Sequence, residues 1–329
     1  MANAVTGLIA IVLGVGGALV LFWLLNTVVE RLPARQEQLL KPYVFIGPAL
    51  LVVGIFLLYP TFLTIRDSFQ TRIGTPDQEW TLANYDYLFT DPALRDALFN
   101  NFLWILVVPF GAVALGLLVA VLADRLRPTS EKIAKSLIFM PMAISFVGAA
   151  TIWSFIYTWR PEGTDQIGLL TAIATGLGAF PETPILQQSS FRANTFALIV
   201  VMIWLQAGFA MVLLSAAIKN VPNDTIEAAR IDGATEIQIF WRVTVPQIAS
   251  TIVVVGTTIL ILVLKIFDIP RVMTNGNFNT DVIANVYFDQ AFTFGNQGRA
   301  SVVVVALIIL TLPFMYINIQ RFRQQEAQR

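Results

Sequence analysis

Long apolar stretches alternate with shorter polar segments along this chain. A helix that crosses the hydrocarbon core of a bilayer needs about 20 mostly apolar residues. Windows of that length occur seven times, at 5–28, 44–65, 102–123, 137–157, 195–218, 250–267 and 301–319. The pattern therefore predicts an all-α polytopic membrane protein with about seven transmembrane helices.

The polar segment between the fifth and sixth predicted spans has the residues of two short helices. Asn223 and Asp224 are helix-capping residues, and Gly233 favours the end of the first helix because glycine adopts the left-handed conformation without strain. Thr235 and Gln238 have the spacing of a capping box, which begins a second helix. We therefore expect a helix, a tight turn and a second helix.

Composition narrows the class of protein. The chain has 329 residues, of which 56% are hydrophobic and 13% charged, and its mean hydropathy is +0.71. It contains no cysteine and no histidine, which excludes disulfides, thiolate or imidazole metal sites, and Ser/His or Cys/His catalysis. The 21 basic and 21 acidic residues balance, so no basic surface for nucleic acid is expected.

The distribution of basic residues predicts the orientation. Thirteen of the 21 Lys and Arg residues fall in the shorter loops that share a side with segment 219–248, and eight fall in longer loops on the other side. Cytoplasmic loops carry the excess of basic residues. We therefore expect the N-terminus outside, the 219–248 hairpin inside and the C-terminus in the cytoplasm.

The residues of the hairpin resemble a known motif. The residues Glu227, Ala228 and Ala229, then Gly233 six positions after the glutamate, then Val243, Val245 and Pro246, resemble the EAA loop of the permease subunits of bacterial ABC importers. In that family the loop is the coupling helix, which docks into a cleft on the ATPase subunit. The resemblance implies an ATPase-coupling site at Glu227, Ala228, Ala229, Gly233 and Pro246.

The resemblance extends over nearly the whole chain. The stretches NFLWILVVP, IFMPMAIS, IWLQAGFAMV and FDIPRVMTNG are most similar to the first permease of alpha-glucoside importers, with glucosylglycerol, trehalose and maltose permeases as neighbours. This implies an ATP-driven importer of oligosaccharides or glycosides that works by alternating access in the bacterial cytoplasmic membrane. The implied partners are a second homologous permease subunit, two ATP-binding subunits that hold ATP and Mg, and an extracytoplasmic sugar-binding protein. No cofactor is expected in this chain.

The resemblance also divides the chain into three parts. Residues 1–42 are an extra transmembrane helix with a cytoplasmic tether, 43–100 a second transmembrane helix with an external segment, and 101–329 the permease core. Asp91 and Pro92 are an N-cap and first-turn pair, which predicts a short surface helix before the third span.

Polar and aromatic residues inside the apolar stretches are candidates for the substrate path, because hydrogen bonds and ring stacking hold a sugar. They are Thr151, Ser154 and Tyr157 in the fourth span, Trp204, Gln206 and Phe209 in the fifth, and Thr257 and Thr258 in the sixth. Carried over from the family, the sugar contacts fall on Leu205, Gln206, Phe209, Ile259, Val263 and Ile266. For each single Ser or Thr, a bond to its own helix backbone is the stronger expectation. For the fifth span, the cost of burying an unpaired amide favours Gln206 with Phe209 toward a wet cavity, and Trp204 toward helix packing or the partner permease.

An ionisable pair stands at the outer end of the sixth predicted span. Lys265 and Asp268 are three residues apart, which places them on one face of a helix. They either line the mouth of the path or serve a structural role at the membrane interface, and the structural role is the stronger expectation.

Two other classes of protein fit the sequence less well. A G-x-x-x-x-G-K-[ST] phosphate loop is missing, so we expect no ATP hydrolysis, and no enzyme activity, in this chain. An ion-coupled secondary sugar transporter is the alternative, but it would need carboxylates in mid-helix and two repeated halves. No predicted span has a carboxylate near its centre, and no constellation of catalytic groups lies at membrane depth.

Overall fold

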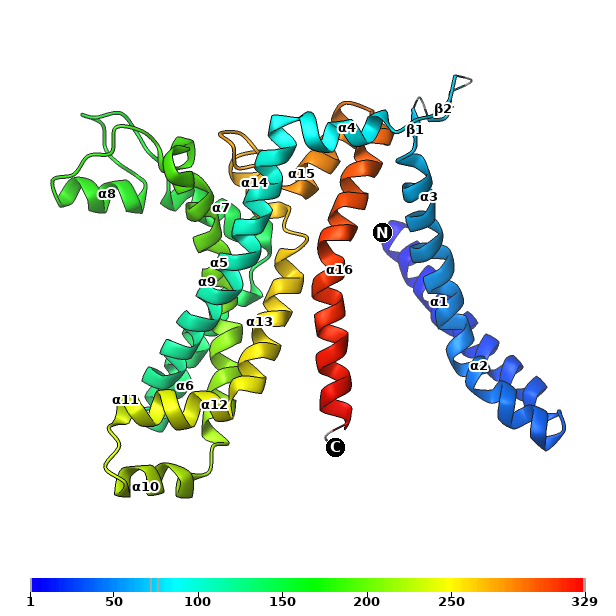
Figure 1. Cartoon of the computed structure of the whole chain (residues 1–329), viewed down its shortest axis with the longest axis horizontal. Coiled ribbons are helices and arrows are strands. Elements are labelled where there is room, and N and C mark those ends of the chain that lie inside the picture. Colours follow the sequence, from blue (N-terminus) through cyan, green and yellow to red (C-terminus); the bar gives the residue numbers. More distant parts are fainter. Residues whose placement is uncertain (1, 72, 76, 328–329) are drawn as a thin grey trace. The chain divides into compact units, whose positions relative to one another are not determined.

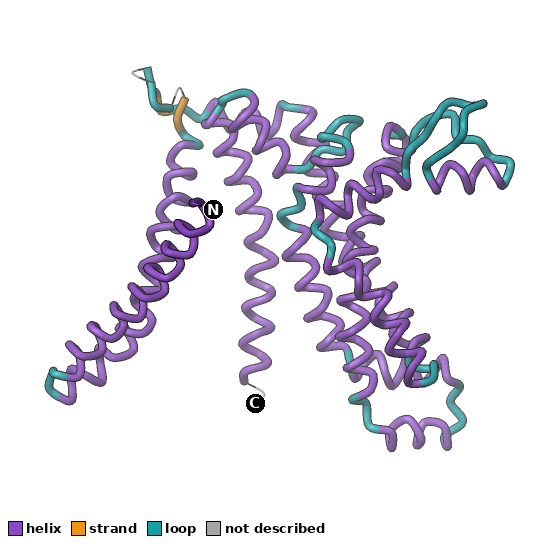
Figure 2. The backbone as a smooth tube through the Cα atoms, turned by 180° about the vertical axis from the view of Figure 1, so that it is seen from behind, coloured by secondary structure: helices purple, strands orange, loops and turns teal. Residues whose placement is uncertain are grey.

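The structure is a computed structural model, and it describes residues 2–71, 73–75 and 77–327. Most of these residues are helical, as Figures 1 and 2 show, in agreement with the all-α prediction. Within the described residues the sheet structure is one short antiparallel pair, β1 (Gln70–Thr71) with β2 (Glu79–Trp80). The chain divides into two compact units, Met1–Asp67 and Ser68–Arg329.

The first unit is a pair of long helices. Its elements are α1 (Ala2–Glu30), α2 (Ala34–Val53), a π-helical turn (Gly54–Leu58) and α3 (Tyr59–Asp67). The π-helical turn joins α2 to α3, so that Ala34–Asp67 is one segment of 34 residues, long and apolar enough to cross a membrane. The predicted span 44–65 lies within it.

The second unit contains the remaining helices. They are α4 (Ala83–Thr90), α5 (Pro92–Ala123), α6 (Pro128–Phe139), α7 (Phe146–Ile156), α8 (Leu169–Gly176), α9 (Ala193–Lys219), α10 (Asn223–Ile231), α11 (Glu236–Ile239), α12 (Val245–Gln247), α13 (Ala249–Val263), α14 (Asp268–Met273), α15 (Ile283–Phe288) and α16 (Gln297–Ala327). In Figure 1, α10, α11 and α12 lie at one end of this unit, here called the hairpin end. Helices α4, α8, α14 and α15 lie at the opposite end, here called the loop end.

Four helical segments among the described residues can cross a membrane by length and composition. They are Ala34–Asp67, Pro92–Ala123, Ser190–Lys219 and Gln297–Tyr316, and two bent helix pairs raise the number to six. The first predicted span, 5–28, coincides with α1, but only its part Leu19–Glu30 is counted among the described apolar helices, and that part alone is too short. The count of seven spans therefore stays a prediction.

Two predictions of helix boundaries are wrong. The fourth predicted span is not one helix, because α6 and α7 meet at an angle of 105°. Between them Met140–Ala143 is a 3-10 turn that contains Pro141, and Ser145 starts α7 by accepting a hydrogen bond from the Gly148 N–H at 3.1 Å. Asp91 does cap a helix, as predicted, but that helix is α5 itself, which continues without a break into the third span.

Helix α9 is at the centre of the second unit. Helices α5, α6, α7 and α13 pack against it, and large apolar side chains such as Leu198, Met202 and Met211 are buried completely. The contact with the end of α6 is especially close at Gly208. A Cβ atom at this position would lie 2.8 Å from the Cα of Phe139 and closer still to the carbonyl oxygen of Ile138. Only glycine therefore fits where these two backbones meet.

Candidate functional site at the hairpin end

The segment between α9 and α13 is a helical hairpin with a well-defined turn. Helix α10 ends at Ile231, and Gly233 has a φ of +81°. The N–H of Ala234 donates to the carbonyl of Ala229, and the N–H of Gly233 to that of Arg230, both at 3.0 Å. This pair of bonds is the Schellman arrangement, which requires the left-handed residue in its middle. The predicted turn at Gly233 is confirmed.

The second helix of the hairpin begins as the sequence predicts. The hydroxyl of Thr235 accepts a hydrogen bond from the N–H of Gln238 at 3.4 Å, and the Gln238 side chain accepts one from the N–H of Thr235 at 2.8 Å, which completes the capping box. The Arg230 guanidinium pairs with both carboxylate oxygens of Glu236, at 2.9 and 3.3 Å. Both side chains are more than half exposed, so solvent screens this ion pair and its main effect is on the geometry of the turn.

The start of the first helix differs from the expectation. Asn223 and Asp224 are not its N-cap, because Pro222 occupies that position and no side chain caps the helix. Asp224 lies instead in the first turn, where its negative charge interacts favourably with the helix dipole.

The hairpin passes directly into a core helix. Residues Glu236–Gln247 form one helical segment that includes the π-helical turn Phe240–Thr244, and it meets α13 at an angle of 69°. This segment ends at Gln247, one residue after Pro246. Ile239 and Ile248 are buried and anchor this segment to the rest of the unit.

The outer surface of the hairpin carries the residues of the predicted coupling motif. Glu227, Ala228, Gly233 and Pro246 are exposed and Ala229 is half-buried. Three large apolar side chains are exposed on the same hairpin, Ile231 at 86%, Ile237 at 73% and Trp241 at 61%. A group of exposed apolar side chains next to a carboxylate is typical of a surface that another protein covers.

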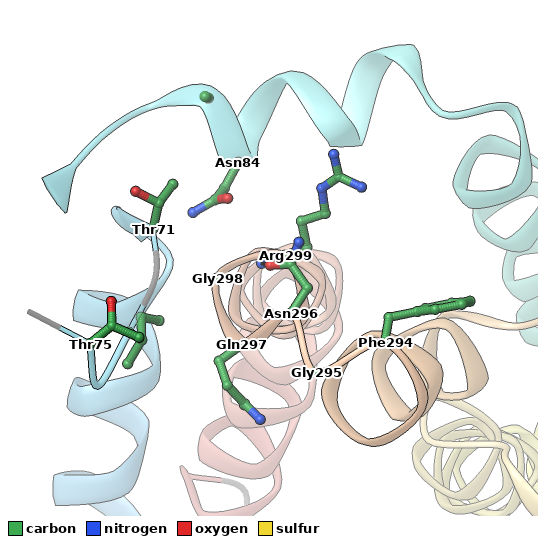
Figure 3. Close-up of a pocket in the computed structure, with 11 residues that line it drawn as sticks. Thr71, Thr75, Asn84, Phe294, Gly295, Asn296, Gln297, Gly298 and Arg299 are labelled. Carbon is green, nitrogen blue, oxygen red and sulfur yellow. Dashed lines mark hydrogen bonds between the residues drawn. The ribbon is translucent and has the colours of Figure 1, made fainter. Parts of the chain in front are cut away.

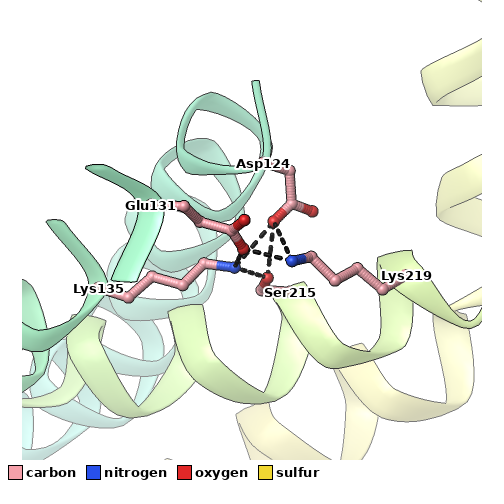
Figure 4. A network of polar contacts seen from close by, with 5 residues as sticks. All are labelled: Asp124, Glu131, Lys135, Ser215 and Lys219. Atoms are coloured by element: carbon pink, nitrogen blue, oxygen red, sulfur yellow. Dashed lines mark hydrogen bonds and ion pairs between the residues drawn. The ribbon is translucent and has the colours of Figure 1, made fainter. Parts of the chain in front are cut away.

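A cluster of polar side chains lies at the base of the hairpin (Figure 4). It consists of Asp124, Glu131, Lys135, Ser215 and Lys219, and we call it the base cluster. The Lys135 ammonium donates to Asp124 Oδ1 at 2.8 Å, to Glu131 Oε1 at 2.5 Å and to the Ser215 hydroxyl. Ser215 donates to Asp124 Oδ1 at 2.9 Å, and Lys219 pairs with Glu131. The cluster therefore connects α6 and α9 to Asp124, the residue that caps the end of α5.

Sequence reasoning missed the base cluster. Glu131 and Lys135 have the i, i+4 spacing that predicts an ion pair on one helix face, and this local signal was available. The contact between Lys135 and Ser215 joins residues 80 positions apart and depends on how α6 packs on α9. A cavity of about 450 Å³ adjoins the cluster, and its lining includes Asp124, Lys219 and Arg230.

The hydroxyl candidates for the substrate path all bond to their own helices. Thr151, Ser154, Thr257 and Thr258 each donate to the carbonyl oxygen four residues back, at 2.7 to 2.9 Å. This agrees with the stronger of the two expectations for single hydroxyl residues. Tyr157 donates to the carbonyl of Ala197 at 3.0 Å and thereby links α7 to α9.

The sugar-contact positions carried over from the family lie together, but inside the packed core. Leu205, Gln206, Ile259, Val263 and Ile266 are all at most 4% exposed. In this conformation Gln206 therefore does not face a wet cavity, contrary to the expectation, and its amide oxygen is buried without a hydrogen-bond partner among the described residues.

The two aromatic candidates on α9 are less buried than their neighbours. Trp204 and Phe209 are both half-buried. The ring of Trp204 meets that of Trp153 edge to face, with the ring centres 5.7 Å apart. Trp204 therefore contributes to the packing of α7 on α9.

The prediction that Lys265 and Asp268 share one helix face is wrong. Helix α13 ends at Val263, and Asp268 is the first residue of α14. Pro270 explains the break, since a proline is tolerated in the first turn of α14 but would remove a hydrogen bond and clash inside a continuous α13. Among the described ion pairs none joins these two residues.

Two cavities of about 540 and 550 Å³ lie at the loop end, and Figure 3 shows the first of them. Phe294, Asn296 and Arg299 line both. Their polar groups are largely engaged within the chain: Asn84 donates to two backbone carbonyl oxygens, and Asn296 accepts from the N–H of Arg299. The Arg299 guanidinium lies 5.0 Å from the ring centre of Tyr87. The Asn84 bonds attach α4 to the chain around β1, and the Arg299–Tyr87 contact attaches α4 to the start of α16.

The apolar helices and the capped hairpin at one end of the unit agree with the resemblance to the permease subunits of ABC importers. Residues 112–325 match the family described as binding-protein-dependent transport system inner membrane component. The chain belongs to this family, and the resemblance seen in the sequence is confirmed.

Two relatives match over most of the chain. The osmoprotective compounds uptake permease protein GgtC of Synechocystis is 50% identical over 285 residues, which covers 87% of this chain and 100% of the relative. The alpha-glucoside transport system permease protein AglF of Rhizobium meliloti is 44% identical over 342 residues, which covers 99% of each chain.

Solved structures share the fold. A bacterial ABC transporter that imports the acidic polysaccharide alginate matches with a TM-score of 0.71 at 20% identity, over 88% of this chain and 99% of that chain. The alginate transporter in complex with a pentasaccharide-bound periplasmic protein matches with a TM-score of 0.69 at 19% identity, over 85% and 94% of the two chains.

Proposed function

We propose that this permease subunit imports small glycosides, such as glucosylglycerol, trehalose or other alpha-glucosides, together with a second permease subunit, two ATPase subunits and an extracytoplasmic sugar-binding protein. The observation that carries the substrate class is the similarity to GgtC and AglF, which extends over 87% and 99% of the chain. The alginate transporter structure, solved with a pentasaccharide-bound periplasmic protein, supports the proposed binding-protein partner.

The exposed hairpin is the proposed ATPase-coupling site. Glu227, Ala228, Ala229, Gly233 and Pro246 belong to it, and the apolar residues Ile231, Ile237 and Trp241 supply the rest of the docking surface. ATP and Mg are bound by the partner ATPase. Because the hairpin leads from α9 into α13, a movement of the ATPase displaces two core helices at once.

The proposed arrangement in the membrane has seven spans, with the N-terminus outside and the hairpin and C-terminus in the cytoplasm. The excess of basic residues in the loops on the hairpin side supports this orientation. The seventh span would be α1.

The proposed substrate path runs along α7, α9 and α13, past Thr151, Ser154, Trp204, Leu205, Gln206, Phe209, Thr257 and Thr258, with Lys265 and Asp268 near its outer mouth. The sugar-contact positions on α9 and α13 are closed against each other in this structure. A sugar would therefore meet Gln206 only after α9 and α13 separate, and this opening is the step that ATPase movement would drive.

Purification of the complex from its native membrane, followed by mass spectrometry of the bound small molecules, tests this function. The proposal predicts a glycoside that co-purifies together with an ATPase subunit. A complex that contains an ion-driven partner, or that carries an amino acid or a metal ion in place of a sugar, would contradict it.

A further inference from the structure

We propose that the base cluster is the joint that transmits movement of the hairpin to the bent helix pair α6–α7, and that Lys135 is the positioning residue at its centre. This inference rests on the proposed coupling function of the hairpin, and it adds the route by which movement leaves the hairpin.

The position of Lys219 connects the cluster to the hairpin. Lys219 is the last residue of α9, and α10 begins four residues later, at Asn223. Its ion pair with Glu131 therefore attaches the base of the hairpin to α6 across 88 residues of sequence. If the ATPase displaces α10, the Lys219 side chain transmits that displacement directly to Glu131.

Lys135 uses all of its donors in the cluster. An ammonium group has three N–H donors. Here they are engaged by Asp124 at the end of α5, by Glu131 on the same helix and by Ser215 on α9. The Lys135 side chain is only 19% exposed. Its position relative to α5 and α9 is therefore fixed in more than one direction.

A second close contact makes α6 follow α9. Gly208 lies seven residues before Ser215, which is about two helical turns on the same face, and there the backbone of α9 meets Ile138 and Phe139. With contacts at both ends, α6 cannot slide along α9 without breaking one of them. Movement then passes through the 105° bend into α7, where Trp153 contacts Trp204 beside the proposed path.

The cluster also has a second pairing available to it. Asp124 Oδ2 is buried and has no partner among the described residues. Lys219 lies 3.8 Å from Asp124 Oδ1 while it pairs with Glu131. A small shift of Lys219 from Glu131 toward Asp124 exchanges one ion pair for another without leaving a charge unpaired. Two discrete arrangements of the same side chains are what a transmitting element requires.

The partial burial of these ion pairs favours this role over a purely stabilising one. The cluster holds two acidic and two basic side chains, of which Asp124, Glu131 and Lys135 are 15–19% exposed. The desolvation of partly buried charges offsets part of their mutual attraction, so an ion-pair cluster adds less net stability than apolar packing of the same volume. It does, however, impose a defined geometry on the three chain segments that it joins.

The test compares Lys135→Met with Lys132→Met in the complete transporter in proteoliposomes. Lys132 is on the same helix but is exposed, so it is a matched control. We expect Lys135→Met to retain the ATPase subunits and their basal hydrolysis, while hydrolysis stimulated by binding protein with glucosylglycerol falls at least tenfold per complex. Lys132→Met should leave both unchanged, and Lys135→Arg should restore most of the stimulation, since arginine keeps the charge and the donors.

A loss of stability alone would reduce the amount of complex and leave the stimulated turnover per complex unchanged. Normal stimulation in Lys135→Met therefore overturns the inference. If Lys135→Met fails to assemble, Asp124→Asn replaces it. The amide keeps an acceptor for Lys135 and Ser215 but has no negative charge with which Lys219 could pair, so the exchange of ion pairs is lost and stimulation should fall; normal stimulation would overturn the inference. The separate variant Gly233→Val tests the coupling hairpin itself. If Gly233→Val loses ATPase binding while Lys135→Met keeps normal stimulation, the transmitting role of the base cluster is refuted and the coupling role of the hairpin stands.

Discussion

The variant Gly233→Val tests the backbone shape of the hairpin separately from the side chains on its surface. Apart from the two neighbouring residues, no heavy atom of the described residues lies within 4 Å of a Cβ added at this position, so a side chain there fits without a collision. The free-energy cost of a side chain here therefore comes from the backbone conformation, in which φ is +81°. A residue with a side chain pays about 1–2 kcal/mol in the left-handed region, and a β-branched valine is at the upper end of this range.

That strain shifts the hairpin away from the turn held by the Ala229 and Arg230 carbonyls. Since about 1.4 kcal/mol corresponds to a tenfold change in an equilibrium constant, we expect affinity for the ATPase subunit to fall about 5- to 30-fold. The assay is a titration of purified ATPase subunit against the permease pair in nanodiscs, with membrane insertion measured separately. Insertion should be unchanged, because Gly233 is exposed at the hairpin end.

Gly233→Asn is the matched control. Asparagine adds a side chain of similar size to valine but tolerates the left-handed conformation, so it should bind the ATPase within about twofold of the parent. Equal losses in the two variants would show that the ATPase contacts position 233 directly and that backbone strain is not the cause. Full binding and full uptake with valine would remove the hairpin from the coupling mechanism.

Three further outcomes are expected. Burial raises the pKa of Asp281 to about 6, so the folded state holds a proton that the unfolded state releases near pH 4. The free energy of unfolding should then decrease by up to about 3 kcal/mol as pH rises from 4 to 6, and Asp281→Asn should abolish this slope in melting curves of the purified complex. Gly208→Ala should sharply lower complex yield because its Cβ meets the α6 backbone, while Gly256→Ala should be tolerated, since its nearest neighbour is 3.8 Å away. Gln206→Leu removes a buried, unpaired amide oxygen, so the melting temperature of the complex should stay the same or rise while glucosylglycerol uptake falls. Trp204→Ala should instead lower the yield of the complex. Lost yield for Gln206→Leu, with lost uptake at full yield for Trp204→Ala, would place Trp204 and not Gln206 on the substrate path.

The parts of the fold that the sequence predicts well are those determined by near neighbours. The turn at Gly233 and the capping box of Thr235 and Gln238 depend on hydrogen bonds that span no more than five residues. Long apolar windows likewise locate the helices, because burial in lipid depends on composition over about 20 residues. Such signals are contained within one stretch of chain, so no knowledge of packing is needed to interpret them.

Two errors had a local signal that hydropathy concealed. Pro141 lies inside the fourth apolar window and Pro270 follows the sixth, and each accompanies a break in the helix. An apolar window continues through a proline, while the hydrogen-bond ladder of the helix does not. The hydropathy pattern therefore predicts one continuous helix with Lys265 and Asp268 on the same face, whereas α13 ends before Lys265 and α14 begins at Asp268.

Other features depend on contacts between distant segments. The burial of Gln206 follows from the packing of several helices, and nothing in its flanking residues indicates it. The base cluster brings Lys135 within hydrogen-bond distance of Ser215. The hydrophobic periodicity of each helix does not predict which residues of α6 lie opposite which residues of α9. Sequence reasoning therefore predicts the turn and the capping box of the hairpin and misses the contacts at its base.

The central claim is that this chain is the permease of an ATP-driven glycoside importer, and uptake into proteoliposomes tests it most directly. The purified transporter with its binding protein would be supplied with labelled glucosylglycerol and trehalose, with ATP and Mg inside the vesicles or with a proton or sodium gradient alone. Uptake that requires ATP and the ATPase subunits, and that no ion gradient replaces, is the predicted result. Gradient-driven uptake by the permease without the ATPase would contradict the claim.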